Sequence, residues 1–140
     1  MKPDQIAVVV TARNNGVART IRMALRGVGV RNIHLASSSA EGLQLLQSVG
    51  PDVLIVVVDG PDNDEGVAFI RSVRDAASGP YAATPIVAAS SRRDLQTVQA
   101  VIGAGGNEYV VLPASGDALF KKIANAIRVR AADAGEPGRV

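Results

Sequence analysis

Residues 51–66 read PDVLIVVVDGPDNDEG, and in this stretch a run of apolar residues ends in an acidic loop that contains glycine and proline. Residues 53–58 are apolar without a break, which is typical of a strand covered on both faces, as in the centre of a parallel sheet flanked by helices. Asp59, Asp62, Asp64 and Glu65 follow this strand, at the sheet edge where open α/β folds bind their ligands. The stretch therefore predicts both the kind of fold and the place of a functional site.

Strands and helices alternate on both sides of this stretch. Short apolar or β-branched runs predict four more strands, at residues 5–11, 32–36, 84–89 and 107–112. A helix follows each strand: Asn14 or Asn15 caps the first, Ser38 or Ser39 the second, and Ser115 the last. Five strand–helix units with short links predict an α/β fold with a doubly wound, five-stranded parallel sheet and helices on both faces.

The third and fourth helices are predicted from their apolar periodicity. The third spans residues 66–76 and is stopped by the Ser-Gly-Pro sequence at 78–80. The fourth spans residues 94–102 and ends at the GAGG sequence of residues 103–106, which has the composition of a helix C-cap and turn. The side chains of the fourth helix expected to face the sheet are Leu95, Val98, Val101 and Ile102.

The composition bounds the kind of protein. The 140 residues fit one domain, at residues 5–130, followed by a polar tail at residues 131–140 that we expect to be disordered. The chain has no cysteine, which excludes disulfides, thiolate metal sites and cysteine nucleophiles. A net charge of +2, with two Phe, two Tyr and no Trp, does not favour nucleic acid as a partner. We expect no signal peptide and no membrane span, and therefore a cytoplasmic protein.

Four segments together resemble the receiver domain of two-component response regulators. They are RGVGV at residues 26–30, the Pro-Asp pair at 51–52, SGPYAATPIVAAS at 78–90 and GAGGNEYVVLPAS at 103–115. The resemblance covers residues 5 to about 129, and it implies the flavodoxin-like receiver fold of the chemotaxis regulator, with strand order 2-1-3-4-5. It also implies a role in bacterial signal transduction.

The residues that carry phosphoryl transfer in that family are largely missing. An active receiver has two acids after the first strand for Mg²⁺, an acceptor Asp after the third, a hydroxyl after the fourth and a Lys after the fifth. Here the acidic pair falls on Ala12 and Arg13, and the lysine position on Leu112. The acceptor position falls on Val57 by two counts and on Val58 by a third.

Two positions of the family pattern are retained. Ser90 fits the hydroxyl position, and Tyr109 fits the aromatic position of the switch. Asp59 is one or two residues beyond the acceptor position, and the Gly60-Pro61 pair turns the chain there. The resemblance therefore implies a degenerate pseudo-receiver, for which we expect no catalytic residue, no cofactor and no bound metal, Mg²⁺ included.

Three functions are considered. The first is a phosphorylation-independent module that binds a partner protein or its own copy, with Arg19, Arg22 and Arg26 as the candidate interaction face, although a solvated basic helix face explains them more simply. The second is a phosphorylatable single-domain response regulator that uses Asp59. The third is a sensor of an anionic ligand such as a nucleotide, because arginine side chains suit phosphate oxygens.

Arg13 carries the sharpest expectation. It follows the first strand, beside the end of the third, so both strand ends meet near the acidic loop. We expect its guanidinium to take the place of the missing cation and to pair with Asp59, or failing that with Asp62 or Asp64.

Overall fold

The chain forms one five-stranded parallel sheet. The structure is a computed structural model, and it describes residues 1–134, without the side chains of residues 76–78 and 132–134. The strands are β1 (Ala7–Thr11), β2 (Asn32–Ala36), β3 (Val53–Val57), β4 (Ile86–Ser90) and β5 (Glu108–Val111). Their order in the sheet is β2-β1-β3-β4-β5, and all neighbouring pairs are parallel. The predicted fold class and strand order are confirmed.

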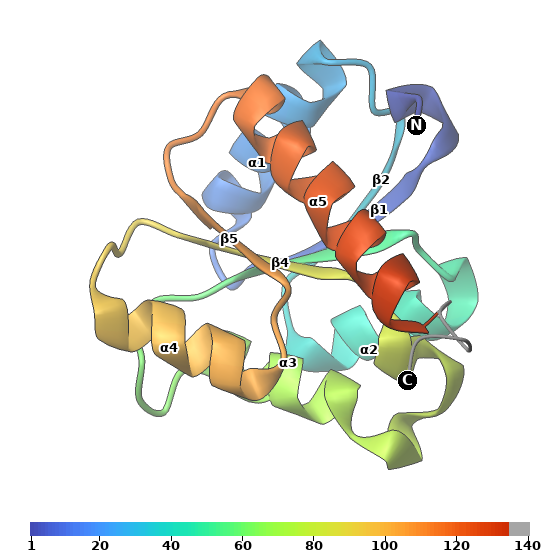
Figure 1. The fold of residues 1–140 in the computed structure, drawn as a ribbon. Coiled ribbons are helices and arrows are strands. Elements are labelled where there is room, and N and C mark those ends of the chain that lie inside the picture. The colour runs from blue at the N-terminus through green and yellow to red at the C-terminus, as the bar shows by residue number, and fades with distance from the viewer. Residues whose placement is uncertain (135–140) are drawn as a thin grey trace.

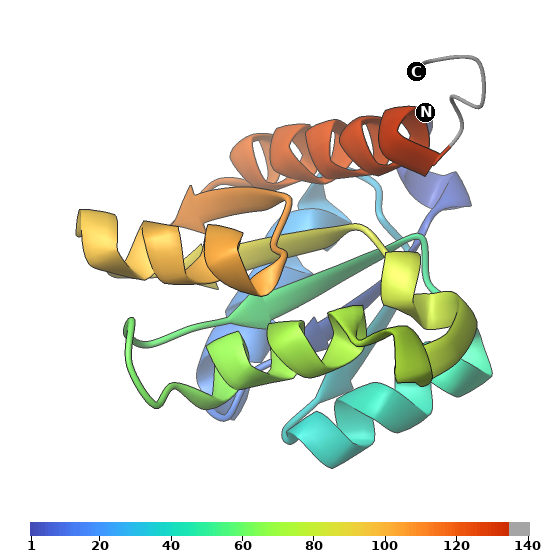
Figure 2. The ribbon, with the colours of Figure 1, turned by 60° about the horizontal axis from the view of Figure 1, so that its bottom comes forward.

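Helices cover both faces of the sheet (Figures 1 and 2). The helices α1 (Asn15–Gly27) and α5 (Gly116–Ala134) lie on one face. The helices α2 (Ser39–Val49), α3 (Glu65–Arg74) and α4 (Leu95–Ala104) lie on the other. Two 3₁₀ segments, η1 (Pro3–Gln5) and η2 (Ala76–Ala83), precede β1 and follow α3.

The strand β3 has a neighbour on each side and sends alternate side chains to the two helical layers, because successive residues of a strand point to opposite faces. Val53, Ile55 and Val57 pack with the layer of α1 and α5. Leu54, Val56 and Val58 pack with the layer of α2, α3 and α4. This alternation explains why the six residues read as one uninterrupted apolar run.

Side-chain caps set the starts of the helices, as the sequence indicates. The Asn14 side chain accepts hydrogen bonds from the backbone N–H groups of Gly16 and Val17 at 2.8 and 3.2 Å, so Asn14 and not Asn15 caps α1. Ser38, and not Ser39, caps α2. Ser115 Oγ accepts from the N–H of Ala118 at 3.1 Å at the start of α5.

The inward face of α4 differs from the prediction. Val101 is buried, but Leu95 and Ile102 are 67% and 64% exposed. The buried stripe consists of Thr97, Val101 and Ala104, which recur at i, i+4 and i+7. A polar threonine occupies one of these positions, so the apolar pattern alone points to the wrong face of the helix.

The boundaries of α3 and α5 differ from those predicted. The helix α3 begins at Glu65, after the Asp64 cap, and ends at Arg74, two residues before the predicted end. The helix α5 continues to Ala134, so residues 131–134 of the predicted tail are helical, and residues 135–140 lie outside the described residues. The Leu112–Pro113 peptide bond is cis. Between residues 1 and 134, no helix is long and apolar enough to cross a membrane.

Candidate functional site

The ends of four strands meet at the carboxyl edge of the sheet. The register pairs Thr11 with Val56, Val57 with Ala89, and Ser90 with Val111. Because the strands are parallel, the residues at or just beyond these ends are brought to the same edge. They are Ala12, Val57, Ser90 and Leu112.

Two hollows open at this edge, and Val57 lines both of them. The smaller has a volume of about 20 Å³, and Ala12, Arg13 and Glu65 are among its lining residues. The larger has a volume of about 500 Å³ and lies between α1, the loop after β3 and the loop after β5, where Leu112 and Asp59 also line it. We call this larger hollow the α1 groove.

Val57 and Val58 have different surroundings. Val57 is partly buried, packs against the core on the side of α1 and α5, and reaches both hollows. Val58 is 1% exposed and belongs to the core under α2, α3 and α4. Of the two positions that the sequence offers for the acceptor, Val57 is thus the one at the mouth of the hollows.

Arg13 does not have the predicted partner. Its Nε lies 3.6 Å from Oε2 of Glu65, so the expected pairing with Asp59, Asp62 or Asp64 is wrong. Both side chains of the pair are largely exposed, at 72% and 61%, and such an ion pair stabilises a fold by at most about 1 kcal/mol. A positive charge does lie at the mouth of the smaller hollow, but water screens it.

The carboxylate of Asp64 bonds to backbone N–H groups and not to Arg13. One oxygen of Asp64 accepts from the N–H of Asp59 at 2.9 Å, and the other accepts from the N–H of Val67 at 3.1 Å. The side chain of Asp64 thus closes the loop and caps α3 at the same time. Glu65, one residue further, is left on the first turn of α3 to meet Arg13.

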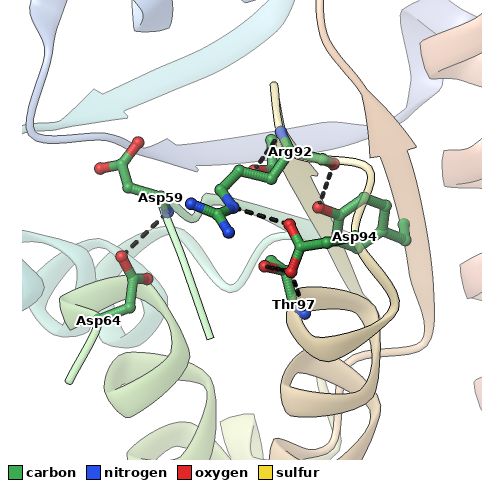
Figure 3. A network of polar contacts seen from close by, with 7 residues as sticks. Asp59, Asp64, Arg92, Asp94 and Thr97 are labelled. Atoms are coloured by element: carbon green, nitrogen blue, oxygen red, sulfur yellow. Dashed lines mark hydrogen bonds and ion pairs between the residues drawn. The ribbon is translucent and has the colours of Figure 1, made fainter. Parts of the chain in front are cut away.

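Asp59 lies at the rim of the α1 groove. Figure 3 shows its carboxylate pointing away from both Asp64 and Arg92. Asp59 is exposed, and between residues 1 and 134 its carboxylate has neither a hydrogen bond nor an ion pair. Asp59 therefore presents a negative charge without compensation at the rim of the α1 groove.

Ser90 and Tyr109 are connected through the backbone of Arg92. Ser90 Oγ accepts from the N–H of Arg92 at 3.1 Å, and the hydroxyl of Tyr109 donates to the carbonyl of Arg92 at 2.7 Å. The Arg92 side chain in turn donates to Asp94 from Nε to Oδ1 at 2.7 Å (Figure 3). Ser90 and Tyr109 therefore hold the same residue in the loop before α4.

The carboxylate of Asp94 anchors this network. It accepts hydrogen bonds from Arg92 and from both the N–H and the hydroxyl of Thr97, at 2.7, 3.0 and 2.8 Å. The bond from the Arg92 side chain, followed by that from Thr97, holds the pKa of Asp94 well below its ordinary value. Asp94 is therefore ionised throughout the physiological pH range, and the start of α4 stays capped.

The residues at the edge do not fit Mg²⁺, the cation that an active receiver binds. Magnesium requires oxygen ligands, whereas Ala12 and Val57 offer methyl groups and Arg13 offers a guanidinium. In the part of the chain that the structure describes, no three His, Cys, Asp or Glu side chains are grouped as metal ligands would be.

The basic face of α1 is available to solvent. Arg19 and Arg26 are exposed and Arg22 is partly buried, and within residues 1–134 none of the three forms an ion pair. Met23, between them in sequence, is 73% exposed. We call Arg19, Arg22, Met23 and Arg26 the α1 face.

Comparison with known proteins identifies the family. The family model of the response regulator receiver domain matches residues 8–124. The chain therefore belongs to the response regulator receiver domain family and, through it, to two-component signalling. It is 29% identical over 106 residues to the KDP operon transcriptional regulatory protein KdpE of Escherichia coli (strain K12). That match covers 76% of this chain but 44% of KdpE, so the chain spans less than half of that relative.

Solved structures show the same fold. A protein of Chloroflexus aurantiacus J-10-fl, described as a response regulator, has a TM-score of 0.75 and 27% identity, over 88% of this chain and 98% of that one. The chemotaxis protein CheY4 of Vibrio cholerae has a TM-score of 0.73 and 21% identity, over 86% of this chain and 98% of that one.

Two features of the site escaped the sequence analysis. The pairing of Arg13 with Glu65 depends on the loop conformation that Asp64 imposes. The network of Arg92, Asp94 and Tyr109 has a weak signal in the sequence, since an arginine two residues before the helix-capping Asp94 can reach the cap.

Proposed function

We propose that this chain is a pseudo-receiver, a receiver domain that binds a partner protein in bacterial signal transduction without being phosphorylated. The observation that carries the proposal is the aliphatic character of the carboxyl edge, where Ala12, Val57 and Leu112 stand beside the retained Ser90. We assign these three to the positions of the metal ligand, the acceptor and the lysine. We further propose that the protein acts in the cytoplasm, by binding and not by catalysis.

The physical reason is that a phosphoryl group carries negative charge that must be neutralised. Active sites for its transfer supply metal ions and cationic side chains next to the acceptor. Arg13 is the cation closest in sequence to this edge, and its side chain is directed to Glu65 in solvent. An acyl phosphate at this edge would be poorly stabilised.

The first prediction tests the loss of phosphorylation. Addition of beryllofluoride with Mg²⁺, a mimic of the phosphoryl group, is expected to leave the amide ¹H–¹⁵N spectrum unchanged, because no in-register carboxylate binds it. Treatment with acetyl phosphate and Mg²⁺ is expected to leave the intact mass unchanged.

The same experiment decides the alternative in which Asp59 is the acceptor. The Asp59 carboxylate is exposed and unpaired within residues 1–134, so it is the carboxylate to test. A phosphoryl mass increase that is lost in Asp59→Asn would replace the pseudo-receiver with a working receiver. The matched control is Asp62→Asn, which removes the same charge from the same loop.

We propose the α1 face as the surface that meets an acidic partner. Its arginines have no acidic neighbour bonded to them within residues 1–134, so an incoming carboxylate does not have to displace one. The exposed Met23 adds an apolar contact at its centre. Complementary charges of this kind mainly raise the association rate and select the partner.

The second prediction is that Arg19→Glu with Arg26→Glu weakens partner capture from host extract by about tenfold or more, because two attractive charge pairs become repulsive. The matched control is Arg71→Glu with Lys121→Glu, which makes the same charge change on the exposed surfaces of α3 and α5. Quantitative mass spectrometry of the captured proteins measures the ratio. Equal loss in both double variants would contradict the α1 face as the docking surface.

A further inference from the structure

We propose that the α1 groove binds a small amphipathic amine. In this proposal the ammonium group pairs with Asp59, and the apolar part of the ligand lies against Val57 and Leu112. The inference goes beyond the proposed function, because it gives the domain a chemical input at the place where its relatives receive a phosphoryl group.

The size of the groove suits a small molecule. Its volume of about 500 Å³ falls in the range of roughly 300 to 1,000 Å³ that ligand pockets occupy. Ile21 of α1 and Leu119 of α5, which help to line it, are 2% and 1% exposed, so they are fixed by the packing of the core. The groove is therefore largely formed before a ligand arrives.

The lining of the groove is mainly apolar. Aliphatic side chains come from α1, from the end of β3 and from the segment that leads into α5. They are Val17, Ile21, Val57, Leu112, Ala114 and Leu119. A hydrocarbon chain placed here would leave water for a surface that has few hydrogen-bonding groups, which is favourable. A phosphate placed against the same side chains would lose its hydration without replacement.

The charge at the rim selects a cation. The Asp59 carboxylate points away from Asp64 and Arg92 (Figure 3). Two nearby arginines have other partners, since Arg13 pairs with Glu65 and Arg92 pairs with Asp94. The exposed Arg93, in the same loop as Arg92, is not part of the lining of the groove. The negative charge of Asp59 is therefore left to attract a ligand ammonium group, and an anionic ligand is disfavoured in this groove.

The other polar side chains that line the groove are those of Asn14, Thr20 and Ser91. The Asn14 side chain accepts from two N–H groups of α1, and the Thr20 hydroxyl donates to the carbonyl of Gly16 at 2.9 Å. These bonds occupy the Asn14 side-chain oxygen and the Thr20 proton, and none of the three side chains carries a charge. The Asp59 carboxylate can therefore be the main polar determinant, and an alcohol of the same shape should bind less well than the amine.

The test uses the unmodified ¹⁵N-labelled chain and butylamine, hexylamine and octylamine as probes. Saturable shifts are expected for amides around the α1 groove, with affinity rising about two- to fourfold per added methylene group. Octanol is expected to bind about fivefold more weakly than octylamine, and octanoate more weakly still, because each lacks the attraction to Asp59. Octanoate binding as tightly as octylamine would overturn the proposal, and so would the absence of saturable shifts with octylamine.

Two single variants separate the groove from the acidic loop as a whole. Asp59→Asn is expected to weaken octylamine binding about fivefold and to leave octanol binding unchanged. Asp62→Asn, with the same charge change outside the lining of the groove, is expected to leave octylamine binding unchanged. Both side chains are exposed, so both variants should fold. Equal weakening by the two variants would show a general charge effect and contradict a specific site at Asp59. The octylamine titrations contain no phosphoryl donor, so their result is independent of the acetyl phosphate experiment.

Discussion

Replacing Arg74 with methionine is expected to lower the free energy of unfolding by about 2 to 4 kcal/mol, because four hydrogen-bond acceptors lose their donor. The corresponding fall in the melting temperature is roughly 10 °C for a domain of this size. Chemical denaturation followed by circular dichroism measures the first quantity, and a thermal scan measures the second.

The Arg74 guanidinium joins the end of α3 to two loops at the amino edge of the sheet. It donates from Nε to the carbonyl of Gly105 at 2.9 Å and from Nη2 to Oδ1 of Asn107 at 2.8 Å. From Nη1 it donates to the carbonyls of Ala82 and Thr84, at 2.8 and 2.6 Å. Methionine fills a similar volume but donates to none of these oxygens, which leaves partly buried acceptors unsatisfied.

The charge state of Arg74 sets the pH range of this effect. Burial lowers the pKa of Arg74 from its ordinary value to about 10, and the positive charge of Arg130 contributes in the same direction. The pKa of Arg74 is lower in the folded chain than in the unfolded chain. At a pH between the two pKa values the unfolded chain binds more protons, so the contribution of Arg74 to the free energy of unfolding rises with pH in that window. Below that window Arg74 is protonated in both states. The difference between Arg74→Met and the parent should therefore be the same at pH 6 and pH 8.

Arg71→Met is the matched control. Arg71 lies three residues earlier on the same helix, but it is exposed. Its substitution is expected to change the free energy of unfolding by no more than about 0.5 kcal/mol. If Arg74→Met were no more destabilising than Arg71→Met, the four hydrogen bonds would have little net value. Because Arg74 is remote from the α1 groove in the fold, octylamine binding by the folded Arg74→Met variant should be unchanged.

The sequence was sufficient for the sheet because its signal is local. Each central strand is a short apolar run, and burial on both faces requires no more than that. The helix starts were readable for the same reason, since Asn14, Ser38 and Ser115 bond to N–H groups two or three residues further along the chain. The inward face of α4 could not be predicted from the apolar pattern, because one inward position is held by a polar residue. Thr97 is fully buried, and its hydroxyl bonds to Asp94.

Contacts between distant segments could not be predicted from the sequence. Three of the four acceptors of Arg74 are backbone carbonyls, which leave no trace in residue identity. At the site, the positions of Ala12, Val57 and Leu112 could be counted from neighbouring motifs, since the lengths of strands and turns are regular. The partner of Arg13 could not be predicted in this way, because it depends on the loop conformation that the hydrogen bond between Asp64 and the N–H of Asp59 imposes.

The conformation of the loop after β3 is fixed by contacts at both of its ends. A Cβ atom on Gly66 would lie 2.5 Å from the carbonyl oxygen of Val57, so a larger residue there would push the loop from the strand end. Asp64 ties the same loop to α3. Ser90 is in place, fully buried beside the strand end. We therefore expect this backbone to accommodate the side chains that an active receiver would carry at the positions that we propose for Ala12, Val57 and Leu112.

Restoring those side chains together is expected to restore the chemistry. The variant with Ala12→Asp, Arg13→Asp, Val57→Asp and Leu112→Lys should bind Mg²⁺, because three carboxylates then converge on one edge of the sheet. Repulsion among these carboxylates should lower the stability of the metal-free variant. Mg²⁺ at about 100-fold excess over its dissociation constant should raise the stability by about 3 kcal/mol. Acetyl phosphate with Mg²⁺ is then expected to add one phosphoryl group, measured as intact mass.

The matched control carries Val57→Asn in place of Val57→Asp and keeps the other three substitutions. It should bind Mg²⁺ more weakly and remain unphosphorylated, since it lacks the nucleophilic carboxylate. Arg13→Asp alone should bind Mg²⁺ weakly and also remain unphosphorylated, because Val57 and Leu112 are unchanged. Phosphorylation of the Val57→Asn control would instead identify Asp59 as an acceptor that needed only the metal and the lysine. A folded four-substitution variant whose melting temperature does not change with Mg²⁺ would show that the edge of this sheet does not have the geometry of a receiver site.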